Sequence, residues 1–306
     1  MIAYVIRRIV MLIPVLFGVV LVSFSLLHLV PGDPAQILAG EVATAEDIAR
    51  IRAEYGLDKP LAVQFGHFVW NAARGDLGKS IQSRHPVNEL LFQRLTFTLQ
   101  LALASILVAS TIGLLAGIIS STRQYSVFDT ASMLGALFGI SMPIFWLGIL
   151  LILVFAVKLH WLPSGGTGSL RYFILPAIAL GSASAAVIAR MTRASMLEVA
   201  RQDYIRTARA TGYAERVVIF RHALKNAMIP VLTVFGLEFG YMLGGAVLTE
   251  TVFSLPGIGR LLVEGIFARD YPVVQGAMML VATTFVLVNL LTDVMYAFFD
   301  PRIRYE

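Results

Sequence analysis

The sequence predicts an all-α membrane protein with six transmembrane helices in a single domain, residues 1–306. The chain is 58% hydrophobic and 14% charged, whereas soluble proteins average about 25% charged residues. Its apolar residues form runs of about twenty, the length that a helix needs to cross a bilayer. The runs are apolar throughout, whereas the strands of a membrane β-barrel alternate apolar and polar residues, so a barrel is disfavoured. The apolar runs cover residues 9–29, 95–119, 132–157, 172–190, 227–249 and 274–298.

Basic residues predict the orientation. With a cytoplasmic N-terminus, the inner segments hold thirteen basic and six acidic residues, whereas the outer segment 31–94 holds seven basic and eight acidic ones. Because cytoplasmic loops carry the excess of Lys and Arg, both termini are expected in the cytoplasm. The first run is read as a retained helix, since no small-x-small cleavage site follows it.

The segment 31–94 is predicted to be an extracytoplasmic insertion with two short helices. Thr44 and Asp47 form a capping-box pattern, Gly56 can stop that helix, and Pro60 can open the next one. A packed cap over the bundle and a docking face for an outer partner both fit this pattern.

Glycine and proline mark special positions within the apolar runs. Glycines four residues apart allow close approach of helices, and packing within the chain is favoured over packing against a second subunit. Pro143 removes a backbone hydrogen bond and is expected to kink the third helix. The glycine repeats are Gly113 with Gly117, Gly135 with Gly139, and Gly236 with Gly240 and Gly244.

The most informative polar stretch is 190–226, which holds eight basic and three acidic residues between two apolar runs. Its apolar residues from Leu197 to Ala208 follow a helical stripe, and Gly212 suits the left-handed position that ends a helix. Two readings remain open from the residues alone: a lever that a partner moves, or an amphipathic helix on acidic lipid.

Resemblance to a known family favours the lever. Residues 203–212 and 221–230 resemble the coupling loop of ABC-importer permeases, and most closely that of the dipeptide, oligopeptide and nickel branch. Gly212 and Ala208 match the family pattern, while Arg206 and Thr207 replace its Glu-Ala pair. Further similar motifs follow in the same order, at residues 31–34, 56–60, 75–80, 161–163, 256–260, 269–272 and 300–302.

This resemblance implies a type I ABC-importer permease fold with cytoplasmic coupling helices at 195–224. It also implies a second homologous permease subunit, two ATPase subunits, an extracytoplasmic peptide-binding protein and a bacterial inner-membrane location. The residues implied for coupling to the ATPase are Asp203, Tyr204, Arg206, Ala208, Arg209 and Gly212.

No nucleotide site is expected in this chain. Gly78, Lys79 and Ser80 resemble part of a phosphate loop, but Ala73 stands where that loop requires glycine. ATP and Mg are therefore assigned to the separate ATPase subunits. The scattered histidines and the lack of a nucleophile beside a base predict no metal, cofactor or catalytic site.

Glu238 lies near the middle of the fifth apolar run. Because an ionisable group at that depth is costly, it should face a polar cavity or a partner. Two roles are equally compatible with its position: lining the translocation path, or a structural hydrogen bond to a neighbouring helix.

Together these observations predict a non-catalytic permease that imports dipeptides, oligopeptides or glutathione by alternating access. A nickel-chelate permease of the same branch is the first alternative. An ion-coupled secondary transporter is less favoured, since no inverted repeat is evident.

Overall fold

The computed structural model describes residues 2–29, 34–39, 43–54 and 56–299. Helices dominate these ranges, which contain no strand beyond one isolated bridge between Lys79 and Pro86. The prediction of an all-α protein is confirmed.

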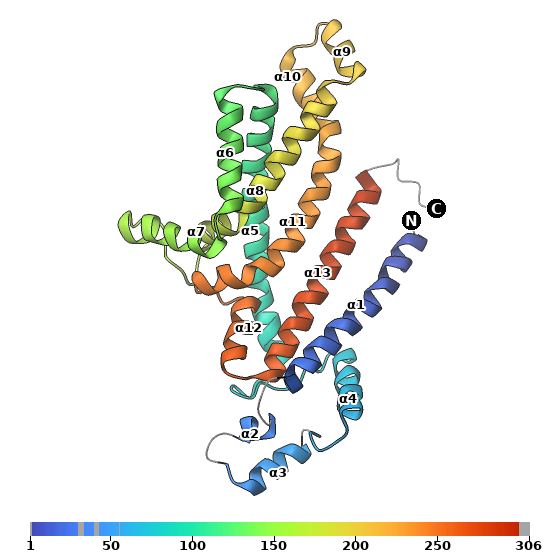
Figure 1. Ribbon diagram of the computed structural model, residues 1–306, viewed down its shortest axis with the longest axis vertical. Coiled ribbons are helices and arrows are strands. Elements are labelled where there is room, and N and C mark those ends of the chain that lie inside the picture. The colour runs from blue at the N-terminus through green and yellow to red at the C-terminus, as the bar shows by residue number, and fades with distance from the viewer. Residues whose placement is uncertain (1, 30–33, 40–42, 55, 300–306) are drawn as a thin grey trace.

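Long apolar helices form the body of the molecule (Figure 1). Within the described ranges, four helical stretches are long and apolar enough to cross a membrane; three contain a predicted run, and the fourth overlaps most of the run 274–298. The first predicted run falls in α1 (Ile2–Leu29), whose described apolar stretch is Ile13–Ser25. The four stretches are α5 (Val87–Thr122), α8 (Arg171–Ala200), Glu215–Val252 with α11 (Leu224–Val252) as its main part, and Tyr271–Thr292 of α13 (Tyr271–Phe299).

The third predicted run is a broken span. Helix α6 (Val127–Ser141) meets α7 (Ile144–Leu151) and the π-helical η1 (Ile152–Lys158) at an angle of 105°. Pro143 explains the break, because its ring pushes the preceding Met142 out of the helical region, to φ −83° and ψ 125°. The predicted kink at Pro143 is confirmed, and it is sharp enough to divide the third predicted run into two helices.

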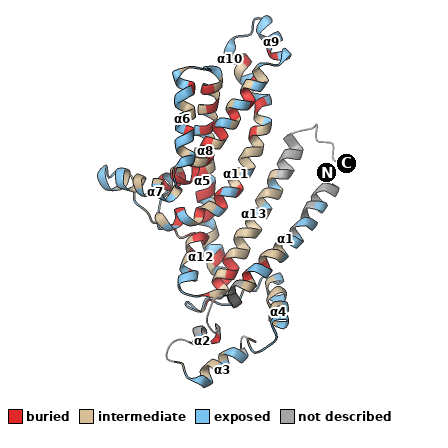
Figure 2. Cartoon of the chain, in the orientation of Figure 1, coloured by how far each residue is buried: buried red, intermediate tan, exposed pale blue. Residues whose placement is uncertain are grey.

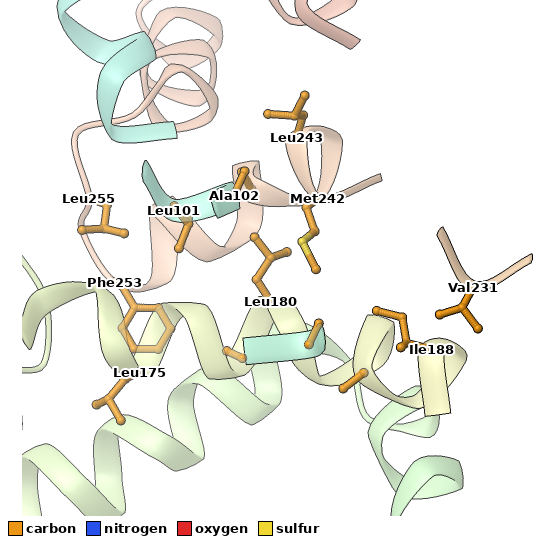
Figure 3. Packing of buried hydrophobic residues seen from close by; sticks show 14 residues of the cluster. Leu101, Ala102, Leu175, Leu180, Ile188, Val231, Met242, Leu243, Phe253 and Leu255 are labelled. Atoms are coloured by element: carbon orange, nitrogen blue, oxygen red, sulfur yellow. The ribbon is translucent and has the colours of Figure 1, made fainter. Parts of the chain in front are cut away.

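The main hydrophobic core lies where α5, α8 and α11 meet. Figure 3 shows buried side chains of these helices gathered around Leu180 of α8, with Leu101 of α5 and Met242 of α11 beside it. Burial is concentrated along α8, whereas α6 and α7 expose much of their apolar surface (Figure 2).

Glycines let α5 lie directly against α8. A Cβ atom built on Gly117 would come within 2.5 Å of the Thr192 Cβ and 2.7 Å of the Ala189 carbonyl oxygen. Gly113 is equally close to Ile188. In the glycine repeat of α11, Gly236 and Gly240 lie against α13. A Cβ atom built on Gly236 would contact the Thr292 side chain, and one on Gly240 would contact the Phe285 side chain.

Two glycines of the repeats do not make such contacts. Within the described ranges, no atom lies within 4 Å of a Cβ built on Gly135 or Gly244, whereas Gly139 faces Ser182 of α8. Packing within the chain therefore accounts for five of the seven repeat glycines.

The two ends of the bundle carry different short helices (Figure 1). One end holds α9 (Asp203–Ala210) and α10 (Glu215–Val217). The opposite end holds α2 (Pro34–Ala39), α3 (Ala45–Glu54) and α4 (Leu61–Ala73), with α12 (Ile258–Phe267) near them between α11 and α13.

Helix α3 begins and ends as predicted. The Asp47 amide donates to the Thr44 Oγ1, and the Thr44 amide donates to the Asp47 Oδ2, both at 3.2 Å. Hydrogen bonds from the Thr44 hydroxyl and then from the Thr44 amide to the carboxylate lower the pKa of Asp47. Gly56 follows at a φ of +65°, and α4 starts directly after Pro60.

Replacing Gly117 by alanine tests the α5–α8 contact. We expect Gly117→Ala to destabilise the protein by about 1–3 kcal/mol, because the added methyl group overpacks a backbone contact. The midpoint of detergent-induced unfolding, followed by helical circular dichroism, measures this loss. Gly135→Ala is the matched control, since its methyl group meets open space; equal midpoints for the two variants would contradict the account.

Candidate functional site

Helix α8 ends at Ala200, before the predicted apolar stripe does. Gln202 adopts an extended conformation, with φ −72° and ψ 148°, and α9 then starts at Asp203. The stripe expected from Leu197 to Ala208 on one helix is therefore split over two helices, a correction to the sequence reading. We call residues 201–223, which join α8 to α11, the elbow.

A small hydrophobic cluster holds the elbow together. Ile205 and Ala208 of α9 are buried against Met196 of α8, Val218 of the π-helical η2 (Val218–Ala223) and Ala227 of α11. The ends of α8 and α11 are thereby fixed to the same short helix. Because packed interiors transmit strain, we expect a displacement of α9 to act on the adjoining ends of both long helices.

Gly212 makes the turn after α9. Its φ of +82° lies in the left-handed region, as predicted, and its amide donates to the Arg209 carbonyl oxygen at 3.0 Å. Arg209 also spans the turn, with its Nη2 2.8 Å from the Glu215 Oε1. Hydrogen bonding to Glu215 raises the pKa of Arg209.

The predicted coupling residues occupy two different environments. Asp203, Arg206, Arg209 and Gly212 are exposed on the elbow surface. Ala208 is only 7% exposed and belongs to the cluster, so it supports α9 from within.

Tyr204 combines the two environments. It is 43% exposed, and its hydroxyl accepts a hydrogen bond of 3.0 Å from the Asn226 Nδ2 of α11. Its contact with an ATPase, like that of the exposed elbow residues, stays a prediction.

Glu238 lies on α11, partly buried, and faces α8. The Ser184 Oγ donates a hydrogen bond of 2.5 Å to the Glu238 Oε2. The contact matches the structural role considered for Glu238. In the described part of the chain, the second carboxylate oxygen makes no hydrogen bond.

Sequence reasoning missed a second carboxylate, Glu250, at the end of α11. It is fully buried, accepts a 2.6 Å hydrogen bond from the Thr98 Oγ1 of α5, and accepts a 3.1 Å bond from the Arg260 amide of α12. Thr98 in turn accepts from the Ile258 amide at 2.9 Å. Three helices therefore converge on one carboxylate.

The turn around Glu250 depends on glycine. A Cβ on Gly257 would lie 2.1 Å from the Glu250 carboxyl carbon, and one on Gly259 would lie 2.4 Å from the Val247 Cα. The glycines of the 256–260 motif were noted as a resemblance, and this contact gives their physical reason. An acid six to nine residues before a glycine-rich turn is the signal that could have pointed to it.

Arg193 has a different role from the one its position suggested. It was counted among the basic residues of the polar loop, but it lies in α8 and forms two 2.9 Å hydrogen bonds with the buried Asp129 of α6. The Ser120 hydroxyl of α5 donates to the same carboxylate. The ion pair thus joins α5, α6 and α8 just before the elbow.

Another buried carboxylate, Asp270, connects two loops at the opposite end of the molecule. It is 3% exposed, accepts a hydrogen bond of 2.5 Å from the Ser80 Oγ, and accepts bonds from the Ile81 and Gln82 amides. This contact ties the loop before α5 to the loop before α13. The predicted motifs at 75–80 and 269–272 are therefore two halves of one contact.

The fold resembles the membrane subunits of solved ABC importers. A structure of the MetNI methionine ABC transporter in an inward-facing conformation matches with a TM-score of 0.59, at 20% identity, over 69% of this chain and 96% of that chain. An amino acid ABC transporter solved with histidines matches with a TM-score of 0.52, at 16% identity, over 70% and 94% of the two chains. The protein has the type I ABC-importer permease fold.

Family models cover almost the whole sequence. The model described as binding-protein-dependent transport system inner membrane component matches residues 109–305, and that of the N-terminal membrane component matches residues 1–102. The chain belongs to this family of inner-membrane permeases.

Two curated relatives match over their full length and that of this chain. It is 48% identical to the dipeptide transport system permease protein DppB of Alkalihalophilus pseudofirmus. It is also 48% identical to the glutathione transport system permease protein GsiC of Escherichia coli.

Removing the Glu250 side chain tests the convergence of three helices. We expect Glu250→Ala to lower the free energy of unfolding by about 2–4 kcal/mol, because it leaves the Thr98 hydroxyl and the Arg260 amide without an acceptor. Unfolding of the purified protein in mixed micelles measures the loss.

Glu264→Ala is the control, since Glu264 is an exposed carboxylate on α12, the helix that carries Arg260, and forms a surface ion pair with that arginine. If both substitutions changed stability by the same small amount, the structural role of Glu250 would be refuted.

Proposed function

We propose that this chain is one permease subunit of an ATP-driven importer that carries short peptides across the bacterial inner membrane. Full-length identity of 48% to dipeptide and glutathione permeases supports this substrate class. Nickel chelates remain a weaker alternative, since neither of these relatives is named for them. A second homologous permease would complete the pathway.

The elbow is the surface proposed for the ATPase partner. Its exposed side chains include both charge signs on a helix that is anchored from behind by the hydrophobic cluster. Two ATPase subunits, carrying ATP and Mg, would each bind the elbow of one permease subunit. The N- and C-termini of this chain would then lie in the cytoplasm, on the same side as the elbow.

An extracytoplasmic peptide-binding protein would deliver substrate at the opposite end. The 31–94 insertion supplies α2, α3 and α4 to that end, and Asp270 ties its last loop to the bundle. Substrate can favour one conformation only through unequal affinity for the outward- and inward-facing states. ATP binding would shift the balance between the two states through α8 and α11.

The energy source separates this function from a secondary transporter. In vesicles that contain the full complex, we expect uptake of a labelled dipeptide to stop without ATP and to survive collapse of the proton gradient. Competition by glutathione and by nickel chelates then ranks the substrate classes. Uptake that follows the proton gradient and ignores ATP would refute the proposal.

Substitution of Gly212 tests the lever. We expect Gly212→Val to retain ATP hydrolysis but to lose most peptide uptake per ATP, because a β-branched residue strains the +82° φ and reshapes the turn. The number of peptides imported per ATP in proteoliposomes is the measurement.

Gly75→Val is the matched control, because Gly75 has a φ of +78° and, like Gly212, has no described atom within 4 Å of its built Cβ. If backbone strain at a positive φ has no effect of its own on coupling, Gly75→Val should import the wild-type number of peptides per ATP. A normal ratio in Gly212→Val would contradict the lever.

A charge-removing substitution tests Glu238 as part of the translocation path. Glu238→Gln still accepts the Ser184 hydrogen bond but cannot pair with the amino group of a peptide. We expect about ten-fold slower uptake of free peptides, as befits the loss of a charged hydrogen bond. N-acetylated peptides should be imported at the wild-type rate.

Ser184→Ala is the control for the structural role, since it removes the interhelical bond and keeps the charge. If Glu238→Gln transported all substrates normally, or slowed both peptide types equally, Glu238 would not recognise the peptide amino end.

A further inference from the structure

An open groove lies between α6 and α8, on the side of the molecule near the elbow. Its volume is about 440 Å³. The residues that line it come from the turn before α6, from α6 and from α8: Tyr125, Asp129, Thr130, Met133, Leu134, Leu137, Arg190 and Arg193. None of these residues belongs to the elbow surface or to the proposed path.

The groove carries one uncompensated positive charge. Asp129 and Arg193 neutralise each other through their bidentate ion pair. Arg190 is exposed and has no ion pair or hydrogen bond with any residue in the described part of the chain. The hydroxyl groups of Tyr125 and Thr130, both exposed, are the remaining polar groups of the lining.

The other wall of the groove is apolar. Leu134 and Leu137 of α6 are 51% and 58% exposed, and Met133 lies beside them. A cation beside an apolar wall complements an amphiphilic anion. A soluble anion would leave the leucines uncovered, and an apolar partner helix would leave Arg190 without a counter-ion.

The position of Arg190 along α8 suits a lipid headgroup. Arg190 ends the apolar run 172–190 and lies three residues before Arg193, about 4.5 Å along the helix axis. A long arginine side chain at such a position places its guanidinium at the membrane interface. With the elbow in the cytoplasm, as the proposed function requires, the groove lies on the cytoplasmic side, where basic pockets between helices bind anionic headgroups.

We propose that this groove binds an anionic phospholipid of the inner leaflet. The phosphate pairs with Arg190 and accepts hydrogen bonds from Tyr125 and Thr130, and an acyl chain covers Leu134 and Leu137. The groove also includes the ion pair between Asp129 of α6 and Arg193 of α8. The bound lipid would therefore stabilise the contact between these two helices, close to the elbow.

Native mass spectrometry of the purified transporter complex tests the site. The delipidated complex is titrated with phosphatidylglycerol and, separately, with phosphatidylcholine of the same chain length. We expect Arg190→Gln to weaken phosphatidylglycerol binding about five-fold, the effect of removing one basic residue worth about 1 kcal/mol. Phosphatidylcholine binding should not change, and Arg190→Lys should bind phosphatidylglycerol within about two-fold of the wild type.

Arg216→Gln is the matched control, since it removes an exposed arginine on α10, outside the groove. Leu137→Asn keeps the charge and should weaken both lipids, which tests the apolar wall without touching Arg190. Equal binding by Arg190→Gln and Arg216→Gln would overturn the proposal. So would a lipid-free complex in which Arg190→Gln loosens the second permease subunit, because a protein would then occupy the groove.

Discussion

The close contact between α5 and α8 is the constraint on which the rest of the structure depends. Lipid offers no hydrophobic drive for helices to associate, so the contact relies on short side chains and backbone approach. A Cβ on Gly181 of α8 would lie 2.7 Å from the Ser105 carbonyl oxygen of α5, and Gly113 and Gly117 approach α8 as closely. Larger residues along this line would separate the two helices and open the core around Leu180.

Helix α8 extends from this core to the elbow, and its last turns are held from two sides. Arg193 joins it to Asp129 of α6, and Met196 joins it to α9 through the buried cluster. The Asp129 carboxylate also accepts a hydrogen bond from the Ser120 hydroxyl of α5, so the pair holds α8 against both α5 and α6. Force that reaches α9 is therefore passed to a helix whose position is already fixed against two neighbours.

Local signals in the sequence predicted much of this architecture. The apolar runs, the α3 cap, Pro143 and Gly212 each act within a few residues, so their effects could be predicted. The 105° bend was not predictable, because neighbours rather than proline alone set the angle. Glu250 with Thr98 and Asp129 with Arg193 were missed because their partners lie 152 and 64 residues apart, beyond any local pattern.

A single-cysteine cross-link tests the central claim that a partner ATPase binds and moves the elbow. The chain has no cysteine, so Arg206→Cys on the exposed face of α9 provides a unique probe, and Arg50→Cys on α3 provides a control at the opposite end. Our account predicts that a short bifunctional reagent joins Arg206→Cys, but not Arg50→Cys, to a nucleotide-hydrolysing subunit in native membranes. An elbow that stays unlinked in an actively transporting complex would contradict it.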